Sequence, residues 1–395
     1  MYRTASWGTI CFALLCLSPL LTRKLPPIDS HPPICYHVHM KKDSESHQSA
    51  NPQHRMVQPG SLLSLDGRLM EAGWATHQIK RFDPALVKAP KLRVKQWDYY
   101  CISNDFFALA LTVSDNGYAG LDAVSVMDFD KKTQHTATRL TPLPLGKRGM
   151  PLGSELGVIR AQGKGYEMTF RTEGPKRHLY GHVYDFGGPG KPLLFDVILT
   201  QPPGDSLVIA TPFRGKPHCF YYNQKINCMP ADGRCIFEEQ EYVFSPASAF
   251  GVLDWGRGVW PYRSSWYWAS ASGMVSGHRF GFNLGYGFGD TSAATENALF
   301  CDGVAHKLAH VAFDIPGAPG REDYLQPWRM HDDQGRLDLQ FQPILDRASK
   351  TSALIISTRQ HQVFGRFSGT ARLDDGSVLT LREFTGFAEK VKNRY

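Results

Sequence analysis

Strict alternation of large apolar and small residues in Phe280–Gly289 is the strongest structural signal in this sequence. In the order Phe-Gly-Phe-Asn-Leu-Gly-Tyr-Gly-Phe-Gly, every second position is large and apolar, and glycine or asparagine stands between. Because successive side chains of a β-strand point to opposite faces, the segment predicts a strand with one apolar and one nearly bare face. A bare face is typical of a tightly curved wall, or of a surface that a ligand or another backbone approaches closely.

Alternating patterns recur along most of residues 57–395, whereas amphipathic helices are scarce, with short candidates only at Pro84–Ala89 and Glu383–Lys392. Tight hairpin turns are predicted at three Asp-Gly pairs that lie between extended segments, namely Asp232-Gly233, Asp302-Gly303 and Asp375-Gly376. Strands at regular spacing without helices between them are typical of antiparallel sandwiches and barrels. The sequence therefore predicts an all-β fold.

A domain boundary is predicted at Ser245-Pro246-Ala247-Ser248, a short run of small residues and proline. It divides the alternating part of the chain into units of comparable size at residues 57–245 and 246–395. We expect these units to be two consecutive antiparallel barrels or sandwiches.

Residues 1–56 form a separate segment with two open interpretations. The uncharged, apolar residues 4–22 follow Arg3, and this layout is typical of a secretory signal or a membrane anchor, with a disordered linker behind it. Membrane association would then run through residues 4–22, and the protein would be membrane-associated or secretory. Alternatively, translation begins at Met56 and the protein is cytoplasmic.

Charge and motifs exclude several function classes. Lys and Arg total 44 against 37 Asp and Glu, and no basic run stands out, so the sequence does not predict a nucleic-acid partner. No Cys-x-x-Cys or His-Glu-x-x-His motif is present, so no metal and no cofactor are predicted. Cys228 and Cys235 flank one predicted hairpin; we expect buried free thiols, with a disulfide as the alternative.

An aromatic block, Gly251–Trp268, holds four of the eight tryptophans and one carboxylate, Asp254. Tryptophan and tyrosine offer large apolar faces with a polar tip, which suits the wall of a ligand cavity. Burial in such a cavity would let Asp254 act as a general acid. Seven further residues of the block are candidate ligand contacts: Trp255, Arg257, Trp260, Tyr262, Arg263, Trp266 and Trp268. The alternative is that Asp254 pairs with Arg257 or Arg263 and that the tryptophans fill a core.

Three polar residues after the alternating strand are further candidate ligand contacts: Asp290, Glu296 and Asn297. They would hydrogen-bond a ligand at the mouth of a barrel, or else cap a loop. The glycines before them alternate within a strand and do not open a helix, so a phosphate-binding loop is excluded.

The sequence resembles the uncharacterised family called domain of unknown function 2804, over residues 57–395. Five blocks carry the resemblance: Glu71–Ala75, Lys95–Tyr100, Gly117-Tyr118, Asp254–Trp268 and Gly287–Asn297. The family is distantly similar to the lipocalin-like carotenoid hydratases and tocopherol cyclases. This second resemblance implies paired lipocalin-like barrels, an apolar ligand such as a lipid or isoprenoid, and acid-initiated addition or cyclisation.

Taken together, the residues and the resemblance predict a β-barrel protein that binds a hydrophobic small molecule. Hydration, cyclisation or isomerisation of that molecule is the expected chemistry, with Asp254 as the proton donor. One alternative is a carbohydrate-binding or carbohydrate-processing β-sandwich, in which Asp254 and either Asp290 or Glu296 are the two acids. The other alternative is a non-catalytic structural or interaction module.

Overall fold

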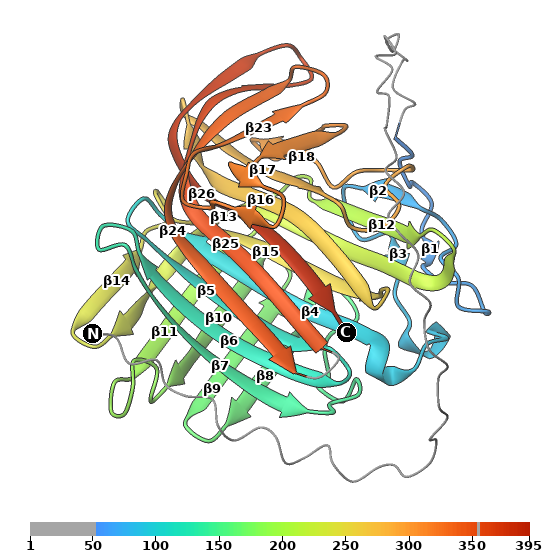
Figure 1. Ribbon diagram of the computed structural model, residues 1–395, viewed down its shortest axis with the longest axis horizontal. Coiled ribbons are helices and arrows are strands. Elements are labelled where there is room, and N and C mark those ends of the chain that lie inside the picture. Colours follow the sequence, from blue (N-terminus) through green and yellow to red (C-terminus); the bar gives the residue numbers. More distant parts are fainter. Residues whose placement is uncertain (1–52, 354–355) are drawn as a thin grey trace, which may run out of the picture. The chain divides into compact units, whose positions relative to one another are not determined.

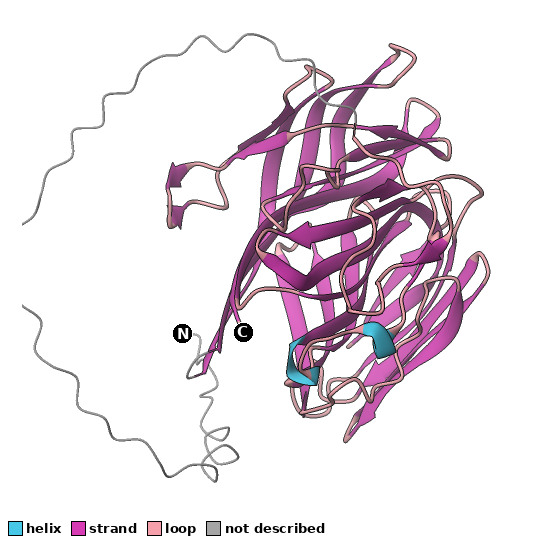
Figure 2. Ribbon diagram, turned by 90° about the vertical axis from the view of Figure 1, so that its right-hand side faces the viewer, coloured by secondary structure: helices cyan, strands magenta, loops and turns pink. Residues whose placement is uncertain are grey.

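The computed structural model describes residues 53–353 and 356–395, and strands dominate this part of the chain (Figures 1 and 2). The helices are two 3-10 turns, η1 (Pro84–Leu86) and η2 (Lys91–Arg93). The prediction for residues 4–22 lies outside the described residues. No helix among those described has the length and apolar character needed to span a bilayer.

The first sheet runs in the order β7-β6-β5-β4-β15-β13-β11-β10-β9-β8, with all neighbours antiparallel. Its strands are β4 (Val94–Ser103), β5 (Phe107–Asp115), β6 (Ala119–Asp128), β7 (Thr133–Pro142), β8 (Leu156–Gly163), β9 (Tyr166–Glu173), β10 (Lys176–Val183), β11 (Leu193–Thr200), β13 (Lys216–Phe237) and β15 (Phe250–Val259). Three further strands lie outside this order. The strands β12 (Leu207–Phe213) and β14 (Gln240–Phe244) both pair with β13, and β2 (Gly73–Ala75) pairs with β12. A small parallel pair precedes the sheet, β1 (Gly60–Ser61) with β3 (Lys80–Arg81).

The second sheet runs in the order β19-β18-β17-β16-β26-β25-β24-β23-β20, again antiparallel throughout. Its strands are β16 (Arg263–Val275), β17 (His278–Tyr286), β18 (Ala298–Cys301), β19 (Val304–Lys307), β20 (Val311–Asp314), β23 (Trp328–Asp332), β24 (Leu337–Ala353), β25 (Ile356–Arg372) and β26 (Val378–Arg394). A short ribbon, β21 (Gly317–Ala318) with β22 (Arg321–Glu322), stands beside it. The second helical candidate, Glu383–Lys392, is wrong: it lies inside β26, where Phe384 and Phe387 face neighbouring strands of a sheet.

Each sheet curls around its own apolar core (Figure 2). The alternation predicted for Phe280–Gly289 is confirmed in β17, where Phe280, Phe282 and Leu284 are fully buried in the second core. The fold is therefore all-β, as predicted, with two consecutive antiparallel sheets, each curled into a half-barrel. The change of sheet falls between β15 and β16, one strand after the expected boundary at residue 245. The division into two domains stays a prediction.

The two sheets also pack against each other through a third apolar cluster. Tyr99 of β4 meets Trp268 of β16 and Phe387 of β26, with ring centroids 5.8 and 6.4 Å apart. The long strands β24–β26 of the second sheet thus bury both of their faces along part of their length, one in their own core and one against the first sheet.

Two of the three predicted Asp-Gly hairpins are confirmed. Asp302 and Gly303 adopt φ of 47° and 87° between β18 and β19, and Gly376 has φ of 88° in the turn between β25 and β26. Asp302-Gly303 thus meets the requirement of a type I′ turn, positive φ at both central residues, whereas at Asp375-Gly376 only the glycine has positive φ.

The third hairpin prediction is wrong, because β13 runs unbroken through Asp232-Gly233. Gly233 lies opposite Val197 of β11, and a Cβ there would stand 2.2 Å from the carbonyl oxygen of Asp196. The glycine therefore permits close approach of a neighbouring strand. Cys228 and Cys235 are seven residues apart on this strand, about 20 Å at the usual rise per residue. Both are free thiols.

Replacing Gly233 by alanine tests this interpretation. The new Cβ would collide with the backbone of β11, so we expect the free energy of unfolding to fall by more than about 2 kcal/mol. Gly174→Ala is the control: that glycine also has positive φ (57°) but nothing within 4 Å of its Cβ position, so only a conformational cost of about 1 kcal/mol is expected. Denaturant unfolding measures both, and equal losses would contradict the close-approach explanation.

Candidate functional site

A cavity of about 470 Å³ lies between the two sheets. Nine aromatic side chains line it: Trp97, Tyr99, Tyr118, Tyr221, Trp260, Trp266, Trp268, Phe288 and Tyr395. The sequence analysis placed the ligand space inside a barrel. Instead, core clusters fill the inside of each curled sheet, and the space lies where the sheets face each other.

Strand register explains which side chains meet in this cavity. Residues directly opposite one another on neighbouring strands point to the same face. One row crosses the first sheet from β13 to β7, namely Lys225, Asp254, Tyr99, Thr112, Ala123 and Thr138. A second row crosses the other sheet from β16 to β24, namely Trp268, Glu389, Gln362 and Arg347. Every member of both rows lines the cavity. Strand pairing therefore builds the floor of the cavity from the first row and its roof from the second row.

Alternation along β15 divides the aromatic block between two faces. Asp254 faces the cavity, whereas Trp255 is fully buried in the core of the first sheet, edge-on to Tyr222. Arg257 is also fully buried, and its guanidinium pairs with Asp98 at 3.1 Å. Neither Trp255 nor Arg257 lines the cavity, because both are an odd number of residues from Asp254 on an extended strand.

Gly256, between these two residues, has a role on the cavity side. A Cβ at this position would lie 2.0 Å from the indole ring of Trp97. The missing side chain leaves the space that Trp97 occupies in the cavity wall, where it stacks on Tyr221 with ring centroids 6.0 Å apart.

Asp254 forms an ion pair with Lys225, with 2.9 Å between Oδ1 and Nζ. Asn223 donates a hydrogen bond from Nδ2 to the same oxygen, and the Lys225 ammonium lies 4.0 Å from the centroid of the Trp268 ring. The alternative prediction, that Asp254 pairs with Arg257 or Arg263, is wrong. Lys225 was missed, although a lysine in the middle of the apolar strand Cys219–Met229 is a signal for a buried charge with a partner.

Glu296 brings a second carboxyl group to the cavity, from the loop after β17. Burial raises its pKa to about 7, Lys225 opposes that shift, and Asp254 adds to it. Its carboxyl group makes no hydrogen bond to any residue that the structure describes. The bare face of β17 makes room for it: a Cβ on Gly285 would lie 2.7 Å from the Glu296 carboxyl carbon.

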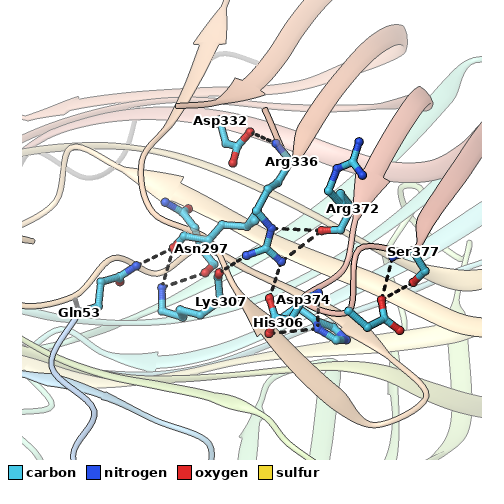
Figure 3. A network of polar contacts seen from close by, with 11 residues as sticks. Gln53, Asn297, His306, Lys307, Asp332, Arg336, Arg372, Asp374 and Ser377 are labelled. Carbon is cyan, nitrogen blue, oxygen red and sulfur yellow. Dashed lines mark hydrogen bonds and ion pairs between the residues drawn. The ribbon is translucent and has the colours of Figure 1, made fainter. Parts of the chain in front are cut away.

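A polar network holds the backbone on either side of Glu296, and three of its members, Gln53, Asn297 and Lys307, are labelled in Figure 3. Lys307 donates to Thr295 Oγ1 at 2.8 Å and to the Asn297 carbonyl oxygen at 2.9 Å. Gln53 accepts a hydrogen bond from the backbone N–H of Thr295. Asn297 accepts from the N–H of Gly285 and donates to the Ala309 carbonyl, so it supports the loop and does not line the cavity. The network positions Glu296.

Glu389 of β26 is a third carboxyl group in the cavity wall, and the sequence analysis missed it. It accepts hydrogen bonds from Trp266 Nε1 at 2.8 Å and from the side-chain amides of Gln360 and Gln362 at 3.2 and 3.1 Å. Burial raises the pKa of this carboxyl group, against the effect of these donors. The pairing of β26 with β25 on one side and with β16 on the other brings these donors together, and no local motif indicates it.

The remaining predicted contacts lie at different places. Trp260, Trp266 and Trp268 line the cavity. Tyr262 lies at the surface, 40% exposed. Arg263 and Asp290 do not line the cavity but an open groove that adjoins it, where Asp290 pairs with Arg214 at 3.4 Å.

One group of potential metal ligands occurs among the described residues, at the hairpin between β18 and β19. Donor atoms of His278, Cys301 and Asp302 lie within 4.8 Å of one another. His278 and Asp302 already pair at 2.7 Å, and none of the three lines the cavity.

The chain has a remote structural likeness to several solved proteins. It matches a protein provisionally named AttH from Nitrosomonas europaea over 80% of this chain and 98% of that chain, with 12% identity and a TM-score of 0.49. Kievitone hydratase from Nectria haematococca matches over 85% and 98%, with 11% identity and a TM-score of 0.46. CghA matches over 76% and 88%, with 12% identity and a TM-score of 0.42.

No curated protein matches the chain in sequence. The family described as "Domain of unknown function (DUF2804)" matches residues 53–395, which include both curled sheets and every residue of the cavity. The resemblance seen in the five sequence blocks is thereby confirmed, and the chain belongs to the DUF2804 family.

Proposed function

We propose that this protein binds a largely apolar small molecule in the cavity between its sheets and catalyses a proton-initiated addition, cyclisation or isomerisation. The observation that carries the proposal is the Glu296 carboxyl group, which is buried in an aromatic cavity without a hydrogen-bond partner among the described residues.

The cavity suits a ligand that is mainly apolar and carries a few polar groups. Its volume falls within the range of small-molecule sites, about 300 to 1,000 Å³. Tryptophan and tyrosine rings form one side, whereas Thr112, Ser114 and Thr136 of the first sheet place hydroxyl groups on another. A lipid or isoprenoid with hydroxyl or carbonyl groups would satisfy both sides.

Glu296 suits the role of proton donor. A carboxyl group with a pKa of about 7 is protonated in about half of the molecules at neutral pH, and catalysis is most efficient when the pKa of the acid lies near the working pH. Asp254 was the expected donor. Its carboxyl group is already engaged, in an ion pair with Lys225 and a hydrogen bond from Asn223, whereas that of Glu296 has no such partner among the described residues. In the proposal the donor is therefore Glu296, and Asp254 accepts a proton.

In the proposed reaction, Glu296 donates one proton to the ligand and Asp254 accepts one proton from it. Glu296 gives its proton to an unsaturated carbon or a carbonyl oxygen of the ligand, and a cation forms beside the rings of Trp266 and Trp268, which stabilise positive charge. Addition of water or of a ligand hydroxyl group, with its proton taken by Asp254, gives hydration or cyclisation. Transfer of a proton from a neighbouring carbon to Asp254 gives isomerisation, and in each case the proton returns from Asp254 to Glu296 through solvent before the next turnover. No cofactor is required.

The hydroxyl-lined side of the cavity favours carbohydrate processing as the second candidate. Asp254 and Glu296 both line the cavity, whereas Asp290 does not, so Glu296 would be the second acid. The mass of a co-purified ligand separates the two candidates. The third alternative, a non-catalytic module, would be favoured by solid packing around the tryptophans. Three of the tryptophans in the aromatic block line a cavity instead, so the packing does not favour this alternative.

Occupation of the cavity is tested by filling it. Thr112→Trp places a large ring in the floor, so we expect at least a tenfold loss of affinity for Nile red, an apolar fluorescent probe, and loss of any ligand seen by native mass spectrometry. Thr380→Trp is the control, because Thr380 is exposed on β26 and does not line the cavity. Unchanged binding by Thr112→Trp would place the ligand elsewhere.

Replacing Glu296 by glutamine tests the chemistry, with the ligand identified by mass spectrometry as substrate. The amide keeps the shape but cannot donate the acid proton, so kcat should fall at least about 100-fold while Kd stays within threefold. Glu155→Gln, at an exposed glutamate outside the cavity, should change neither constant. Full turnover by Glu296→Gln would remove Glu296 from the mechanism.

The raised pKa of Glu296 also predicts a dependence of stability on pH. Unfolded, this group titrates near 4.5, and folded near 7, so between these values the folded state binds more protons and stability falls as pH rises. The loss reaches about 3 kcal/mol above pH 7. Glu296→Gln should therefore be more stable than wild type at pH 8, by an increment that shrinks towards pH 4.5. Thermal unfolding across this range measures it, and a pH-independent difference would contradict the raised pKa.

A further inference from the structure

An open groove of about 920 Å³ adjoins the cavity, and positive charge dominates its lining. Besides Arg214, which pairs with Asp290, six exposed cations line it: Lys216, Arg263, Lys350, Arg359, Lys392 and Arg394. The side chains of these six make no ion pair or hydrogen bond with any residue in the described part of the chain. Asp290 is the one carboxylate among the described lining residues.

Register places these cations directly beside one another. Lys350, Arg359 and Lys392 are opposite each other on the adjacent strands β24, β25 and β26. Arg394 of β26 is in turn opposite Arg263 of β16. Like charges at directly opposite positions destabilise a sheet. Two such sets at one end of the second sheet indicate that an anion offsets the repulsion.

The groove and the cavity meet at three residues that line both, Phe288, Thr358 and Asn393. Alternation along β26 produces this arrangement, since Lys392 and Arg394 point to the groove and Asn393 points to the cavity. Asn393 is 5% exposed, and its Oδ1 atom has no hydrogen-bond partner among the described residues. Ser264, opposite it on β16, also has a buried hydroxyl group without a partner there. Unused polar atoms at the junction fit a ligand that passes from one space to the other.

We propose that the ligand is an amphiphile with an anionic head group, a phosphate, sulfate or carboxylate, which the groove cations bind while the apolar part enters the aromatic cavity. This assignment rests on the proposed function of the cavity and adds the ligand's charge to it. Phe288, on a loop with positive φ at Gly287 and Gly289, packs between the two spaces against Phe213 and Trp260.

The test compares two 12-carbon probes below their micellar concentrations, dodecyl phosphate and the neutral dodecyl glycerol ether, by tryptophan fluorescence and calorimetry. Wild type should bind the phosphate at least tenfold more tightly at 0.1 M salt. The preference should shrink at 1 M salt, since the screening length falls from about 10 Å to about 3 Å. The triple variant Arg359→Gln, Lys392→Gln, Arg394→Gln should lose the preference and keep its affinity for the neutral probe.

Two controls separate charge recognition from damage to the fold. Arg382→Gln removes an exposed cation from the other end of β26 and should leave both affinities unchanged. The ligand-free triple variant should have a Tm equal to or above that of wild type, because the like-charge repulsion is relieved. A lower Tm together with loss of both affinities would show that the cations are structural and would overturn the assignment.

Further arms distinguish the sources of the anion. Equal affinity for both probes in wild type would overturn the anionic head group and leave the cavity proposal intact. Inorganic phosphate binding as tightly as dodecyl phosphate would overturn the amphiphile, because the chain would contribute nothing. Groove-dependent binding to vesicles with 20% phosphatidylglycerol, without binding of monomeric dodecyl phosphate, would assign the groove to a membrane surface instead. Failure of both probes to bind would count against the proposed function itself.

Discussion

The structure depends on strands that bury both of their faces. In β15 all ten residues are buried, so alternate side chains belong to different environments, with Trp255 and Arg257 in the core of the first sheet and Asp254 in the cavity. The strands β25 and β26 repeat this division between the second core and the cavity wall. Because alternation has a period of two, a shift of one residue in register would exchange core and site entirely.

Local pattern was sufficient to predict the class of fold and part of the site. Alternation in Phe280–Tyr286 and two Asp-Gly turns gave an antiparallel all-β fold, and the aromatic block supplied Asp254 and three of the tryptophans that line the cavity. The predictions that were wrong or missing concern features that depend on pairing between strands distant in the sequence. Asp232-Gly233 has the composition of a turn, but the neighbouring β11 needs the glycine for close approach. Lys225 and Glu389 meet Asp254 and Trp266 only through strand order, which no local motif encodes.

Buried ionisable groups are concentrated around the cavity, and such groups seldom stabilise a fold. Taking two charges from water costs several kcal/mol per ion before their attraction is counted. Lys225 and Asp254 are almost wholly buried, Glu296 and Glu389 lie beside them, and burial lowers the pKa of Lys307 behind the loop well below its ordinary value. A polar network holds this loop through Gln53, Thr295 and Asn297 (Figure 3). An arrangement that lowers the stability of the fold in this way is expected at a site organised for proton transfer.

The proposed chemistry depends on Glu296 being a carboxylic acid near neutral pH in the aromatic cavity. The most direct measurement is a titration of the carboxyl carbons by ¹³C NMR in protein labelled at the glutamate side chains, with Glu296→Gln used to assign the resonance. The signal that is absent from the variant should titrate with a midpoint near pH 7. A midpoint near 4.5, the value of an exposed glutamate, would show that water reaches the carboxyl group freely and would contradict the proposed chemistry.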